Sequence, residues 1–130
     1  EVAVLKTDTE GYDLPVLRTF PWDRLRPRVV VAEFEDRKTL PLGYDLDDMA
    51  GFMVQLGYAV LVSEWYPVVE YGQHHRWRSI RRYPTALTDK EGWGNLICVE
   101  PPLAGRVLKQ ARLAPRVQSA WRRAAGRLRR

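Results

Sequence analysis

The sequence EVAVLKTDTEGYD occupies residues 1–13 and places an apolar run directly before a polar, acidic loop. A short, continuous apolar run is typical of a strand that is buried on both faces of a parallel sheet. We therefore predict a strand at residues 2–6. Similar runs predict further strands at residues 28–34, 58–63 and 96–99.

Two helices separate the first three strands in this prediction. Residues 12–19 form the first helix, with Pro15 in its first turn, where the missing amide hydrogen of proline is tolerated. Residues 45–56 form the second, because apolar side chains recur at helical spacing and acidic residues fill its first turn. Gly57 then ends this helix. Residues 65–94 are expected to be a long, irregular excursion rich in aromatic side chains.

Strands that alternate with helices predict an α/β fold with a parallel sheet of about four strands and right-handed crossovers. The last strand follows no clear helix, so it is expected to run antiparallel, as an edge or an insertion strand. The first strand would leave an open edge, which proteins normally cover. Since the chain also lacks an initiator methionine, we expect a fragment. A missing N-terminal half-domain or a second copy of the chain would then cover this edge.

The charge of the chain is concentrated at its C-terminal end. Of the 21 basic residues, nine lie in residues 104–130, which contain no acidic residue. The net charge of +5 therefore describes this tail and not the acidic remainder of the chain. We predict two regions, an α/β unit at residues 1–103 and a basic amphipathic helical tail at residues 104–130.

Three roles are considered for this tail, and two of them are open. It could pack Trp121 on its own domain or on a partner, or it could lie on an anionic membrane surface with its apolar side toward the membrane. Nucleic-acid binding is not expected, because no known motif and no alternation of aromatic and basic residues accompanies the arginines.

Several classes of protein are excluded by composition. The single cysteine, Cys98, rules out a disulfide framework within the chain and a cysteine-based zinc site, and it is expected to be a buried core residue. No apolar run approaches the roughly 20 residues of a membrane span. The charged first ten residues do not form a signal peptide. We therefore expect a cytoplasmic protein, with membrane association only through the tail.

Four motifs occur in order along residues 2–99, each at the end of a predicted strand or helix. They are Lys6-Thr7-Asp8-Thr9-Glu10-Gly11 after the first strand, Arg26-Pro27-Arg28 before a strand that ends in Glu33, Leu56-Gly57-Tyr58 at a helix end, and Asn95-Leu96-Ile97 at the last strand. In this order they resemble the FkbM family of S-adenosylmethionine-dependent methyltransferases.

The resemblance implies a Rossmann-like class I methyltransferase fold, a doubly wound sheet with an antiparallel seventh strand. The chain would contribute the C-terminal half of that domain, beginning at its fourth strand. The methyl donor, S-adenosylmethionine, would be bound by a glycine-rich turn and an acidic residue of the earlier strands, which this sequence lacks. We therefore expect the chain to supply the acceptor side of the parent enzyme. The isolated chain is expected to be inactive, and its cofactor-binding residues are unknown.

Acidic residues follow the first two strands at their carboxyl ends, where open α/β sheets bind ligands. The resemblance places Asp8 and Glu10 near the reacting groups. They are our candidate catalytic residues, because a carboxylate can accept or orient the proton of a hydroxyl. Glu33 and Glu35 are candidate substrate-binding residues. Alternatively, Glu10 or Asp13 could cap the following helix. Asp8 could likewise bind loop backbone.

The aromatic excursion supplies two more candidate substrate-binding residues, His74 and Trp77. Its aromatic side chains could form a lid or a sugar-stacking surface over the site, or they could simply pack on the sheet. A metal site at His74 and His75 is not expected, since adjacent side chains of a strand point to opposite faces.

The resemblance implies O-methylation of a hydroxyl on a sugar or another natural product, with a small-molecule or glycan acceptor. The alternative is a truncated, non-catalytic module that binds a partner or a membrane surface.

Overall fold

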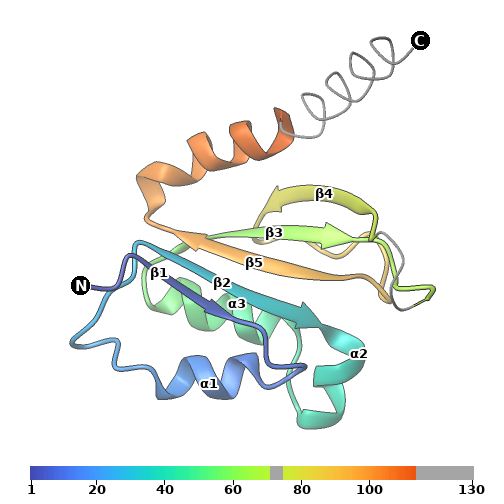
Figure 1. The fold of residues 1–130 in the computed structure, drawn as a ribbon, viewed down its shortest axis with the longest axis horizontal. Helices are drawn as coiled ribbons and strands as arrows, with labels where there is room; N and C mark the ends of the chain where they lie inside the picture. The colour runs from blue at the N-terminus through green and yellow to red at the C-terminus, as the bar shows by residue number, and fades with distance from the viewer. Residues whose placement is uncertain (71–74, 114–130) are drawn as a thin grey trace, which may run out of the picture.

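The computed structural model describes residues 1–70 and 75–113, and its centre is a five-stranded sheet (Figure 1). The strands are β1 (Val4–Thr7), β2 (Val29–Glu35), β3 (Ala59–Trp65), β4 (Trp77–Arg82) and β5 (Trp93–Val99). The α/β class is confirmed. The expected number of about four strands is wrong, because β4 forms within the excursion. Only Ile80 of β4 is buried, so this strand has no apolar run that the sequence could reveal.

The strand order across the sheet is β1-β2-β5-β3-β4. β1 and β2 are parallel, whereas β5 is antiparallel to both of its neighbours, β2 and β3. β1, β2 and β3 therefore run in one direction. The predicted antiparallel direction of the last strand is confirmed, and β5 is an insertion strand, not an edge strand. The sheet is thus mixed and open.

The helices between the first three strands cover one face of the sheet (Figure 1). They are α1 (Asp13–Thr19), the short α2 (Asp36–Thr39) with the 3-10 helix η1 (Leu40–Leu42), and α3 (Leu46–Gln55). The main core lies here, where Leu14, Leu17 and Met49 pack with apolar residues of β2, β3 and β5. Asp47 and Asp48 lie in the first turn of α3, as predicted, whereas Asp45 lies just before the helix and caps it by accepting a hydrogen bond from the Asp48 amide.

A helix at residues 104–113 covers part of the opposite face (Figure 1, orange). It follows the 3-10 helix η2 (Pro101–Leu103) and packs Val107, Leu108 and Ala111 against a smaller apolar cluster on the sheet. Residues 104–113 of the predicted tail therefore form a helix that packs against the α/β unit. The remainder of the tail, including Trp121, lies outside the described residues.

β1 forms one edge of the sheet, and its burial differs from the prediction. Val4 is 58% exposed, and Thr7 is the buried residue of the strand. The expected burial on both faces is thus wrong for β1, because an edge strand with a neighbour on one side leaves much of its surface in solvent. Among the described residues, no helix has the length and apolar character needed to cross a membrane.

Candidate functional site

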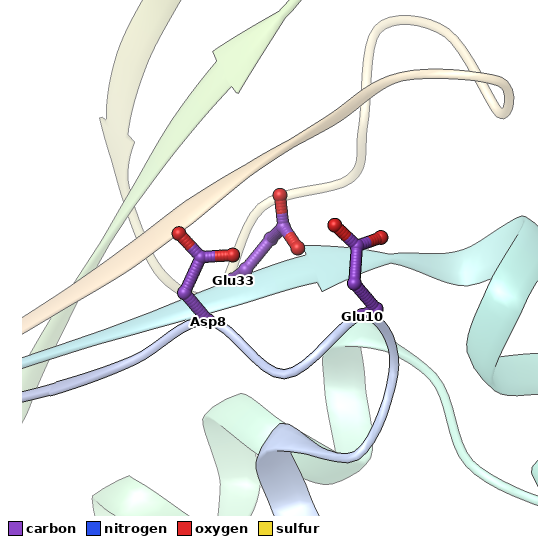
Figure 2. Close-up of side chains that lie close together, drawn as sticks. All are labelled: Asp8, Glu10 and Glu33. Carbon is purple, nitrogen blue, oxygen red and sulfur yellow. The ribbon is translucent and has the colours of Figure 1, made fainter.

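Three carboxylates converge at the carboxyl ends of β1 and β2 (Figure 2). Asp8 and Glu10 come from the loop after β1, and Glu33 comes from β2 itself. Each offers an oxygen that lies within 4.8 Å of an oxygen of the other two. The parallel pairing of β1 with β2 explains this convergence, since the carboxyl ends of parallel strands meet at one edge of a sheet. The two predicted catalytic residues thus lie beside a predicted substrate-binding residue.

Asp13 holds this end of the sheet together from the first turn of α1. Its Oδ1 accepts a hydrogen bond from the Glu33 backbone amide at 3.1 Å. Its Oδ2 accepts from the backbone amide and the hydroxyl of Thr9, at 3.1 and 2.9 Å. The side chain is almost completely buried. Neither Glu10 nor Asp13 caps α1 through its side chain, so that alternative is wrong.

The backbone turns sharply between Asp8 and α1. Glu10 and Gly11 have φ angles of +53° and +100°, in the left-handed region that glycine adopts readily. A Cβ at Gly11 would lie 3.3 Å from the Cβ of Lys38, and the Tyr44 hydroxyl donates to the Gly11 carbonyl. The turn is therefore packed tightly against α2, which carries Lys38.

Two lysines neutralise part of the negative charge. Lys6 Nζ lies 2.6 Å from Asp8 Oδ2. Lys38 Nζ lies 2.6 Å from a carboxylate oxygen of Glu10 and 2.7 Å from one of Glu35. Glu35 thereby joins the site through Lys38. Lys38 was not predicted as a site residue, because its pairing with Glu10 spans 28 residues and no local pattern in the sequence indicates it.

Glu33 differs from its neighbours in having no ion pair or side-chain hydrogen bond within residues 1–70 and 75–113. Burial is the largest cause that raises the pKa of the Glu33 carboxyl from 4.5 to about 7; the charge of Asp8 adds to this rise, and Lys38 opposes it. A carboxyl group with such a pKa can both accept and release a proton at neutral pH.

A cavity of about 130 Å³ lies beside Glu10 and Glu33. The residues that line it are Glu10, Glu33, Glu35, Lys38, Val68, His75 and Trp93. The ring of Trp93 stacks on Trp65 with the ring centroids 5.8 Å apart. The His75 ring lies nearly perpendicular to Trp93, with the ring centroids 5.0 Å apart. The cavity therefore combines charged hydrogen-bonding groups with an aromatic wall.

The predicted aromatic contributors lie elsewhere or cannot be placed. Trp77 does not line this cavity. Its Nε1 donates a hydrogen bond to the Ser63 hydroxyl at 3.1 Å, and its ring packs on the apolar cluster beneath residues 104–113. His74 lies outside the described residues. Trp93 and His75 are the aromatic residues that the fold brings to the acids. Trp93 was not predicted as a strand residue, because the irregular excursion was expected to extend to Gly94, whereas β5 begins at Trp93.

A second charged cluster, centred on Glu64 of β3, does not line the cavity. Glu64 is fully buried and accepts hydrogen bonds from the amides of Thr88 and Asp89, at 3.0 and 3.2 Å. It also pairs with Arg81 of β4. These contacts fix the segment after β4 to the sheet, which is a structural role.

The three converging carboxylates are close enough for one hard cation to contact them together. Lys6 and Lys38 already supply positive charge there. Exposed acidic groups often cluster without an ion. We assign no metal to this site.

Residues 1–60 match the family model of the Methyltransferase FkbM domain. This match confirms, over those residues, the predicted resemblance to the FkbM family of methyltransferases, and it contains the converging acids and Lys38. No curated protein and no solved structure matches the chain.

The family implies S-adenosylmethionine as methyl donor. A glycine-rich turn between a strand and a helix, which would bind this donor, does not occur among the described residues. Within residues 1–70 and 75–113, no turn between a strand and the following helix contains two glycines. The space beside Gly11 in the β1–α1 turn is taken by Lys38. We therefore place no donor atom and assign no donor-binding residue.

Proposed function

We propose that this chain forms the acceptor side of an S-adenosylmethionine-dependent methyltransferase that methylates a hydroxyl group of a sugar or a related natural product. One observation carries the proposal: the residues matched by the FkbM model bring Asp8, Glu10 and Glu33 to one end of the sheet, beside a cavity.

The chemistry of a hydroxyl acceptor suits this arrangement. An alcohol is a weak nucleophile until its proton is removed, and a carboxylate within hydrogen-bond reach contributes about 10²–10⁴-fold to such a step. Fixing the hydroxyl relative to the methyl donor contributes separately, through orientation. Asp8 and Glu10 are proposed to hold the hydroxyl in place.

The walls of the cavity favour an acceptor with one apolar and one polar side. Trp93 and His75 line the cavity and offer aromatic surface to the C–H groups of a ring. Glu35 and Lys38 lie on the cavity and offer a hydrogen-bond acceptor and a donor to hydroxyls. This combination suits a sugar or another polyhydroxylated ring.

The test is methyl transfer by the complete gene product. Tritiated S-adenosylmethionine serves as donor, and methyl glycosides of several hexoses serve as acceptor probes. We expect labelled glycoside from the wild-type protein and a loss of about 100-fold for Asp8→Asn, because the hydroxyl would no longer be held in line with the methyl donor. The control Asp23→Asn changes an exposed carboxylate that makes no side-chain hydrogen bond or ion pair within residues 1–70 and 75–113, and it should keep full activity. Transfer at the wild-type rate by Asp8→Asn would remove Asp8 from the mechanism.

A non-catalytic role as a binding module is the second candidate, because the described residues lack a glycine-rich turn that would bind the donor. The two candidates differ in the complete gene product, where a binding module would transfer no methyl group to any probe. Calorimetric titration of residues 1–130 with S-adenosylmethionine is expected to give no saturable binding. A micromolar Kd would contradict our assignment of this chain to the acceptor side alone.

A further inference from the structure

We propose that Glu33 is the catalytic residue that takes the proton from the acceptor hydroxyl, while Lys6 and Lys38 hold Asp8 and Glu10 in ion pairs. This inference rests on the proposed function and assigns one role within it. The sequence analysis had placed Glu33 among the substrate-binding residues.

The ion pairs divide the three carboxylates into two kinds. Asp8 and Glu10 each have a lysine ammonium group at 2.6 Å. A carboxylate in such a pair is a weaker proton acceptor, because an adjacent positive charge favours its ionised form. The Glu33 carboxylate has no such pair in the described part of the chain. It is therefore the acid of this site that is free to bind a proton.

Glu33 is also the most firmly placed of the three. Asp8 and Glu10 lie in a loop, and their side chains are 52% and 68% exposed. Glu33 lies within β2, paired with Asn95 of the central strand β5, and its amide is bound by buried Asp13. A proton acceptor must keep its position within a fraction of an ångström, and a strand holds a side chain more precisely than a loop does.

The surroundings of Glu33 keep its protonated form accessible near neutral pH. It lines the cavity together with Val68 and Trp93. Burial is the largest cause of its pKa of about 7. The other charged or titratable groups around it are Asp8, Glu10, Asp13, Glu35, Lys6, Lys38 and His75. Lys38 opposes the effect of the acids.

The hydroxyl proton moves to a carboxylate oxygen of Glu33, and the electron pair of the broken O–H bond stays on the hydroxyl oxygen. That electron pair would form the new bond to the methyl carbon. A sulfonium co-substrate, when bound, would supply the methyl group and leave as a neutral thioether that keeps the carbon–sulfur electron pair. Glu33 then returns the proton to solvent, which its pKa of about 7 allows.

The first test needs no substrate. Carboxyl ¹³C NMR of residues 1–130 should show one glutamate that titrates with a midpoint near pH 7, and this signal should be absent in Glu33→Gln. Lys38→Met should move the midpoint upward, because it removes the charge that lowers the pKa of Glu33. Glu100→Gln, an exposed control, should leave it unchanged. A Glu33 midpoint below pH 5.5 would overturn the assignment.

The second test is the methyl-transfer assay with tritiated donor and methyl glycosides. We expect Glu33→Gln to lower kcat by about 100-fold or more and to abolish the rise of kcat with pH near 7, while Glu10→Gln lowers kcat by less than about tenfold. Wild-type transfer with equal activity in Glu33→Gln would overturn this assignment and leave the proposed function intact. Absence of transfer to any probe by the wild-type protein would contradict the proposed function, and the NMR midpoint would still decide the state of Glu33.

Discussion

A single buried carboxylate, Asp13, joins the loop after β1 to strand β2. It accepts hydrogen bonds from two backbone amides and one hydroxyl, and so it fixes both Thr9 and Glu33. Its position in a first helical turn was predicted, but its partners were not, because Glu33 is 20 residues away in the sequence. At the residue scale, the arrangement of the acidic site therefore depends on Asp13, which is not one of the three converging carboxylates.

Replacement of Asp13 should destabilise the protein strongly. Asp13→Ala leaves the partly buried amides of Thr9 and Glu33 without their acceptor, and hydrogen bonds to a charged group contribute about 1.5–3 kcal/mol each. We expect the free energy of unfolding to fall by about 3 kcal/mol. Urea denaturation followed by circular dichroism measures this. The control Asp23→Ala should stay within about 0.5 kcal/mol of wild type, and an equal loss in both variants would contradict the role of Asp13.

Glu33 should make the stability depend on pH. Its folded pKa of about 7 lies above its ordinary value of 4.5, so the folded state holds the proton more tightly than the unfolded chain does. The free energy of unfolding should therefore fall as the pH rises from about 4.5 to 7. Glu33→Gln cannot ionise, so its free energy of unfolding should not fall in this pH range. At pH 8 it should exceed the wild-type value by about 1 kcal/mol, which allows for solvent screening of the half-exposed group. Urea denaturation at pH 4.5, 6 and 8 tests this, and a constant difference between the two proteins would contradict it.

At the scale of elements, β5 makes the sheet continuous. It lies between β2 and β3 and pairs with both along its whole length. The sequence analysis found only its second half, because the first half contains Trp93, Gly94 and Asn95 and lacks an apolar run. Gly94 is required by the packing of neighbouring strands, since a Cβ there would lie 1.9 Å from the Ser63 carbonyl oxygen.

Two glycine-to-alanine substitutions should therefore act in opposite directions. Gly94→Ala should lower the free energy of unfolding by about 3 kcal/mol or more, because backbone atoms of β3 must move to admit the methyl group. Gly51→Ala, in α3 with no atom within 4 Å of the new Cβ, should raise it by up to about 1 kcal/mol. Urea denaturation of both variants provides the measurement. A mild effect of Gly94→Ala would contradict the close approach of β5 to β3.

At the scale of the whole molecule, the sheet separates two apolar clusters. The larger one lies beneath α1 and α3, and the smaller one lies beneath residues 104–113. Cys98 of β5 belongs to the larger cluster and is fully buried, which confirms its predicted core position. Burial raises the pKa of its thiol to about 12.

Labelling of Cys98 should report the opening of the larger apolar cluster. The thiol is buried in that cluster with residues of α1 and α3, so a reagent reaches it only when these helices separate from the sheet or the protein unfolds. We expect a disulfide reagent at pH 8 to react about 10³-fold more slowly in native buffer than in 6 M urea. Gly94→Ala should speed up native labelling, and Gly51→Ala should not. Rapid labelling of the wild-type protein in native buffer would contradict the burial of β5.

The sequence by itself determined the α/β class, the first three strands, the two principal helices and the acidic character of the strand ends. These features depend on local patterns, namely apolar runs, helical spacing and capping residues. The structure alone placed β5 between β2 and β3, added β4, and put Lys38, His75 and Trp93 beside the acids. Those arrangements depend on contacts between residues far apart in the chain. Such contacts follow from how the strands and helices pack together, and they produce no local pattern in the sequence.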